Sequence, residues 1–284
     1  MNHPGQGRTA MAQDSPLYRL VVFDESDDSQ GVRDLFCRVT GIHPTDAAQW
    51  LARVPGVYPK PLPAAQVRPL LDGLYEFGIA AEAWRTDQFP DLSKPRTIHD
   101  AACLPDGFRV KGLRGEPTHW APWEKVELIN AGRISVEDEF KGPSPPSWTS
   151  ALTMGLQALT RRGARLPSRG ARAQRIIRDP IGEVILIRRD PLLAFRIVEN
   201  QMNYAYLGAR LSVVAAENFP VFVADLCARA DHATITAPTR ALVQRLDPEN
   251  HEFPSSQALL EDSLLQLLWR WYRRDRDQQE RTMT

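Results

Sequence analysis

The chain has 284 residues, of which 43% are hydrophobic and 25% are charged, and its 35 basic residues balance its 35 acidic residues. A chain of this length can form two domains, and this composition is typical of globular proteins rather than disordered ones. Because the net charge is zero, no overall electrostatic attraction to nucleic acid or to a membrane surface is expected.

The cysteine and hydropathy patterns indicate a reducing compartment. Cys37, Cys103 and Cys227 are far apart and odd in number, and they lack the C-x-x-C spacing of a zinc site. Residues 1–16 contain no apolar core of a secretory signal, and the chain has no run of about eighteen uncharged apolar residues. We therefore expect a cytoplasmic protein with buried thiols, no membrane span, no metal and no other cofactor.

The N-terminal third predicts a small domain over residues 16–86, preceded by a disordered arm at 1–15. Residues 18–23 are rich in β-branched and aromatic side chains and predict a strand, and the acidic residues 24–28 can cap a following helix. Apolar residues then recur at i, i+3, i+4 and i+7 in three segments, which predicts three helices. These segments are 32–39, ended by Gly41, then 47–54 and 67–74, and residues 79–84 predict a second strand.

A family resemblance is carried by residues 40–55, TGIHPTDAAQWLARVP. They resemble the T-G-L-x-x-x-E-A-x-x-L-V-x-x-x-P segment of the C-terminal domain of the bacterial ribosomal stalk protein, with matches at Thr40, Gly41, Ala47 and Pro55. The correspondence continues without a gap to residues 74–82, which resemble L-x-x-x-G-A-x-V-E. The resemblance implies a βαααβ-type module, a fold shared in outline by the Clp protease adaptor, with Trp50 in its core.

The departures from that family concern function. The stalk domain recruits translation factors through a Lys-rich helix surface, and the corresponding positions here are mostly uncharged: Thr45, Ala48, Gln49, Ala52 and Arg53. The resemblance therefore implies the fold and not the recruitment of ribosomal factors. Three apolar helix faces and two strands provide a self-contained core, which predicts that residues 16–86 fold alone.

The rest of the chain predicts a linker at 87–103 and a β domain at 104–246. Strands are expected at 107–112, 123–129, 183–187, 192–198 and 204–206. Asn218 is expected to cap a helix with Pro220 in its first turn and an apolar face formed by Phe219, Phe222, Val223, Leu226 and Ala230. This order of elements weakly resembles a pleckstrin-homology-like domain. The predicted fold class is thus α+β: the stalk-like module, a mainly antiparallel β domain closed by a helix, and a C-terminal helix within 250–284 whose leucine stripe packs on its own domain.

The usual catalytic motifs, G-x-S-x-G, H-E-x-x-H and the P-loop, are absent from the sequence, so we expect no enzyme. Asp24, Ser26 and Asp28 have the spacing of calcium-loop ligands, but Ser29 and Leu35 replace the required Gly and Glu, which favours helix capping. The cluster of His119, Trp120 and Trp123 is a candidate ligand pocket, and the alternative is that its tryptophans pack in the core.

Residues 141–178 are rich in Gly, Pro, Ser and Arg and are expected to form a flexible insertion. The candidate polyanion contacts are Arg161, Arg162, Arg165, Arg169, Arg172, Arg175 and Arg178. No aromatic residue lies between Thr149 and Arg178, which disfavours base stacking. The favoured function is a non-catalytic intracellular adaptor or scaffold with a protein partner of unknown identity. The alternative is weak association with nucleic acid or anionic lipid through these arginines.

Overall fold

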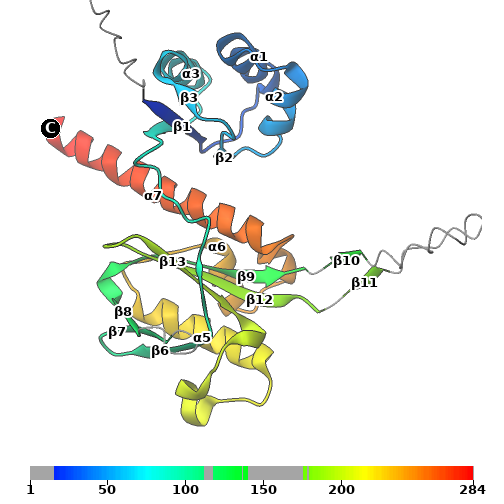
Figure 1. Ribbon diagram of the computed structural model, residues 1–284, viewed down its shortest axis with the longest axis vertical. Coiled ribbons are helices and arrows are strands. Elements are labelled where there is room, and N and C mark those ends of the chain that lie inside the picture. Colours follow the sequence, from blue (N-terminus) through cyan, green and yellow to red (C-terminus); the bar gives the residue numbers. More distant parts are fainter. Residues whose placement is uncertain (1–15, 112–117, 136, 140–174, 178, 284) are drawn as a thin grey trace, which may run out of the picture.

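The computed structural model describes residues 16–111, 118–135, 137–139, 175–177 and 179–283. It is a mixed α+β structure in which the long C-terminal helix α7 (Ser256–Met283) runs between two parts (Figure 1). We call residues 16–86 the module and residues 96–253 the β domain. Among the described residues, no helix is apolar over enough of its length to span a bilayer.

The module consists of a small sheet and three helices. Their order is β1 (Leu17–Val22), α1 (Ser29–Thr40), α2 (Pro44–Leu51), β2 (Gly56–Val57), β3 (Leu62–Pro63), α3 (Ala64–Glu76) and β4 (Ala81–Arg85). β1 is the central strand and pairs antiparallel with the other three. The expected capping is confirmed, because Asp28 Oδ1 accepts a hydrogen bond of 2.8 Å from the Gly31 N–H. Gly41 ends α1 at φ 74°, a left-handed conformation that suits glycine.

The two faces of the module sheet are covered by different parts of the chain. Because side chains alternate along a strand, Leu20 and Val22 face the module's own helices. Trp50 lies in that core at 6% exposure, with ring centroids 4.6 Å from Phe36 and 5.1 Å from Tyr58, so its predicted burial is confirmed. Val21 and Phe23 face the opposite way.

Helix α7 covers this second face of the module. Leu268 of α7 is fully buried in one cluster with Val21 and Phe23. The Phe23 ring lies 5.0 Å from the rings of both Trp269 and Tyr272. The apolar core of the module therefore includes a helix from the other end of the chain, which the expected independent domain at 16–86 did not include.

The β domain is built on a mixed six-stranded sheet. Its strands are β5 (Arg96–Ile98), β9 (Val126–Ile134), β12 (Ile181–Arg188), β13 (Leu193–Val198), β14 (Thr234–Ile235) and β15 (Glu252–Phe253). β9, β12 and β13 are antiparallel neighbours, whereas β5 joins β13, and β14 and β15 join β9, in parallel pairs. A second sheet holds β6 (Asp100–Leu104), β7 (Gly107–Lys111) and β8 (His119–Pro122). β10 (Glu137–Glu139) and β11 (Arg175–Ile177) form an antiparallel pair.

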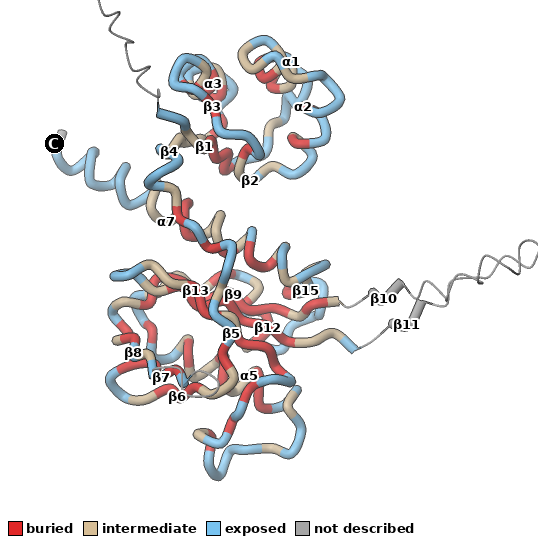
Figure 2. Tube along the Cα trace, in the orientation of Figure 1, coloured by how far each residue is buried: buried red, intermediate tan, exposed pale blue. Residues whose placement is uncertain are grey.

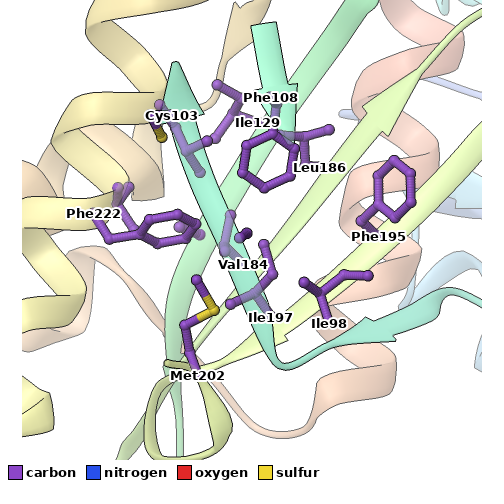
Figure 3. Close-up of a cluster of buried hydrophobic side chains, with 14 of the residues drawn as sticks. Ile98, Cys103, Phe108, Ile129, Val184, Leu186, Phe195, Ile197, Met202 and Phe222 are labelled. Carbon is purple, nitrogen blue, oxygen red and sulfur yellow. The ribbon is translucent and has the colours of Figure 1, made fainter. Parts of the chain in front are cut away.

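A helix packs on each face of the large sheet. On one face, α5 (Ala215–Arg229) and the three-stranded sheet enclose the largest core cluster, where Phe108, Val184 and Phe222 meet (Figure 3). On the other face, Leu259 and Leu267 of α7 pack in a cluster with strand residues of the sheet. The helix α6 (Ala237–Val243) lies beside β9. Buried residues thus follow the strands and the first half of α7, and its end is exposed (Figure 2).

Several elements differ from the sequence-based expectation. The expected linker at 87–103 contains β5 and most of β6, because these residues find partner strands elsewhere in the chain. Residues 123–125 form a 3₁₀ turn before β9. Residues 204–206 do not form a strand, since the 3₁₀ segment 205–210 begins there. The sheet is also mixed and covered on both faces, rather than closed by a single helix.

Asn218 does not cap α5. The helix begins at Ala215, and Asn218 is buried inside it at 4% exposure. Its amide accepts from the Ser212 N–H and donates to the Ser212 carbonyl, both at 2.8 Å. Pro220 consequently lies within the helix rather than in its first turn. The apolar face predicted for this helix is buried as expected, from Phe219 to Leu226.

Candidate functional site

A groove of about 700 Å³, open to solvent, lies between the module, residues 86–93 and the first half of α7. We call it the junction groove. The module contributes residues of β1, of the end of α2 and of β2, and α7 contributes one helix face. None of the three segments forms the groove alone.

The α7 wall follows helical periodicity. Residues 257, 260, 261, 264 and 265 line the groove and recur at i, i+3, i+4, i+7 and i+8, which places them on one side of the helix. Leu260, Leu264 and Leu265 are its apolar part. Gln257 and Glu261 form a polar rim, with a hydrogen bond of 2.8 Å from Gln257 Nε2 to Glu261 Oε1.

Asp262 also lines the groove and is held by the β domain. Its Oδ2 accepts a hydrogen bond of 2.7 Å from Asn130 Nδ2 of β9. Burial raises the pKa of the Asp262 carboxyl, and the hydrogen bonds from Asn130 and Gln266 oppose that rise. Asn130 is fully buried and also accepts a hydrogen bond of 2.7 Å from Thr236 Oγ1. This polar network fixes the α7 wall against the large sheet.

The opposite wall carries two arginines from the module. The Arg19 guanidinium lies 5.3 Å from the ring centroid of Phe89, and Arg19 Nε is buried without a hydrogen-bond partner. Arg53 is exposed at the end of α2. Within the described ranges, the ion pairs involve other residues, so neither arginine has a carboxylate within 4.0 Å.

The polar groups in the lining of the junction groove include hydroxyls and carboxylates. The lining holds no histidine and no cysteine. The Thr86 hydroxyl donates to the Leu17 carbonyl at 2.9 Å, and the Asp91 carboxylate accepts from the Ser93 N–H at 3.0 Å. Hydrogen bonds from the Ser93 side chain and backbone both lower the pKa of the Asp91 carboxyl.

A second, smaller cavity of about 210 Å³ lies within the module. Its floor includes Val22, Phe36 and Leu74, and its rim includes Asp24 and Glu25. Asp24 Oδ2 already accepts a hydrogen bond of 2.9 Å from the Ala80 N–H. Trp50 lines both cavities.

His119, Trp120 and Trp123 do not converge on either cavity. Trp123 is buried, its Nε1–H donates to the Leu104 carbonyl at 2.9 Å, and its ring lies 6.1 Å from that of Phe108. Trp123 therefore packs in the core, as the alternative to a ligand pocket predicted. His119 and Trp120 are successive residues of β8 and point to opposite sides, with His119 Nε2 at 2.7 Å from an Nη atom of Arg96 and Trp120 36% exposed.

The other candidates from the sequence lie elsewhere. Of the seven arginines, Arg175 opens β11 with its backbone described, and the rest lie outside the described residues, as does most of the insertion 141–178. The described part of the chain holds no group of three metal-ligating side chains. The three cysteines are free, and burial raises the pKa of Cys103 to about 12 and that of Cys227 to about 11.

Scans of protein-family models, curated proteins and solved structures find no match to this chain. The junction groove could not be identified from the sequence, because its residues come from three distant segments. The leucine stripe of α7 can be recognised in the sequence. Its periodicity does not show, however, that this helix faces two sheets and a groove.

Proposed function

We propose that this protein is a non-catalytic adaptor that binds a protein partner in the junction groove. The observation that carries the proposal is an apolar groove of about 700 Å³ with two arginines that lack a carboxylate partner in the described residues. Binding sites often lie where parts of a protein meet, and they combine apolar walls with a few polar groups.

Hydrogen bonds hold the α7 wall of the groove in place on the large sheet, and this supports a binding role. Besides the Asn130 network, Trp271 Nε1 donates to Glu127 Oε2 at 2.8 Å, and Arg270 Nη1 donates to the Glu127 carbonyl at 2.8 Å. These bonds hold α7 on β9 while the opposite side of α7 packs on the module. A groove whose walls are already positioned loses less conformational entropy when it binds a partner.

The test compares wild-type chain with a groove variant and a matched control in quantitative affinity capture. Arg53→Glu reverses a charge on the groove, whereas Arg109→Glu makes the same change on β7, away from it. A partner that is enriched by wild type and by Arg109→Glu, and lost with Arg53→Glu, supports the proposal. Capture of the same proteins by all three forms would contradict it.

A further inference from the structure

We propose that residues 208–214 insert their apolar side chains into the surface of a lipid bilayer with neutral headgroups. We call these residues the apolar loop; they follow Leu207 and lead into α5. None of them lines either cavity. This inference therefore concerns a different surface from the junction groove and is independent of the proposed adaptor function.

The apolar loop exposes three large hydrophobic side chains to solvent. Leu211 is 49% exposed, Val213 is 103% exposed and Val214 is 46% exposed. Among the described residues, no other stretch of four exposes more than two large hydrophobic side chains. The segment between β13 and α5 projects from the β domain on the side away from the module (Figure 1). An exposed apolar cluster of this kind marks a surface that contacts a protein or a membrane.

Hydrogen bonds within the chain already use several backbone groups of the apolar loop. The Leu211 N–H donates to the Gly208 carbonyl at 3.1 Å, and the Val214 N–H donates to Ser212 Oγ at 3.2 Å. The buried Asn218 side chain bonds both the N–H and the carbonyl of Ser212 at 2.8 Å. Polar groups that are already bonded lose little free energy when they leave water. The loop is therefore held in its exposed conformation and is suited to a less polar medium.

The charges at the apolar loop are paired within the chain. Arg210 is the one charged residue in the sequence of the loop, and its two Nη atoms donate to the Asp225 carboxylate at 2.8 and 2.7 Å. The Glu217 carboxylate, just beyond the loop, accepts a hydrogen bond from the Ser212 hydroxyl. Because the arginine is neutralised by Asp225, the loop has no free cation for an anionic headgroup. Its chemistry fits neutral headgroups, with apolar insertion as the attractive force.

The size and shape of the apolar loop favour a bilayer over a second copy of the chain. A stable interface between two proteins takes roughly 20–30 residues from each side. The apolar loop is one short projecting segment, and it provides three large apolar side chains. A bilayer surface deforms around such a projection, and reversible binding to it scales with the apolar area that is inserted.

The test is flotation of the full chain with phosphatidylcholine vesicles at low and at high salt. We expect the wild-type chain to float equally at both, because an apolar attraction is not screened by salt. Leu211→Asp and Val213→Asp should each lower the affinity for vesicles at least about tenfold. Leu17→Asp is the matched control, since Leu17 is 47% exposed on β1 of the module, and it should bind as wild type does. Val213→Trp should strengthen binding, because tryptophan favours the membrane interface.

Several outcomes would overturn the lipid contact. One is a wild-type chain that does not float with phosphatidylcholine vesicles. Another is flotation with phosphatidylglycerol vesicles alone that is lost at high salt, which would assign the attraction to cations elsewhere in the chain. Flotation that both loop aspartates leave unchanged contradicts it too, as does an oligomer in analytical ultracentrifugation that they dissociate while no form binds vesicles. If Leu211→Asp lowers the melting temperature, Val213→Asp, at a fully exposed position, decides the result.

Discussion

The role of α7 as a shared layer can be tested at two adjacent residues. Leu267 and Leu268 are both fully buried, but Leu267 lies in the cluster of the large sheet with Ile185, and Leu268 lies with Val21 and Phe23 of the module. Replacing each leucine by alanine in turn makes the same chemical change on two different sides of one helix. Leu267→Ala is therefore the matched control for Leu268→Ala.

The expected magnitude follows from the atoms removed. Leu→Ala deletes three carbon groups, which at about 0.8 kcal/mol for each buried CH₂ gives about 2.4 kcal/mol of lost transfer free energy. The cavity left behind raises the cost to roughly 3–5 kcal/mol where the surroundings collapse only in part. For Leu268→Ala this loss falls on the contact between the module and α7.

The assay combines urea denaturation with hydrogen–deuterium exchange on the full chain. We expect Leu268→Ala to speed exchange in β1 and β4 while β12 stays protected, and Leu267→Ala to speed exchange in β12. A change in the free energy of unfolding within about 0.5 kcal/mol for Leu268→Ala, the range of surface substitutions, would refute the packing described here. Equal loss of protection in β1 and β12 in both variants would refute the separation of the two faces.

Three further predictions concern other parts of the molecule. Trp50→Ala should lower the free energy of unfolding by about 3–5 kcal/mol in urea denaturation, because it empties a space beside two aromatic rings. Burial, and then the charge of Asp275, raise the pKa of Glu82 from 4.5 to about 7. The folded state therefore binds more protons than the unfolded state between these values, and stability should fall as pH rises from about 4.5 to 7. Glu82→Gln should remove this part of the pH dependence and stabilise the chain at pH 8 in thermal melts, and an unchanged profile would contradict the assignment. Replacing the four arginines of residues 161–169 by Gln should abolish retention on heparin and its salt dependence, whereas tight retention by that variant would exclude this stretch as the polyanion contact.

The local patterns of the module could be read from the sequence alone. The three helices follow the i, i+3, i+4 spacing of apolar residues, and Gly41 marks the end of the first because a left-handed residue is needed there. The alternation in β1 likewise indicates that Leu20 and Val21 face opposite ways. Each of these patterns depends only on residues within a few positions of one another. It can therefore be recognised from the sequence without the rest of the fold.

Long-range pairing could not be read in this way. The sequence of residues 96–98 is too short to show that it forms a strand beside β13, and two-residue strands join β9 from positions 234 and 252. Asparagine is a residue type that often caps helices. In the folded chain, however, the Asn218 side-chain amide forms hydrogen bonds with the backbone N–H and C=O of Ser212. Local propensity gives way where a buried polar group finds a better partner.

The candidate site, like the long-range strand pairing, could not be predicted from the sequence. The sequence shows that α7 has a leucine stripe, but a helix stripe records only that side chains avoid water, not what covers them. Packing of Leu268 on the module and of Leu267 on the large sheet uses two faces of α7 and leaves its first turns beside Arg19 and Phe89. The apolar residues of this protein therefore determined its helices and strands, and the arrangement of two sheets around one helix decided where a groove would remain.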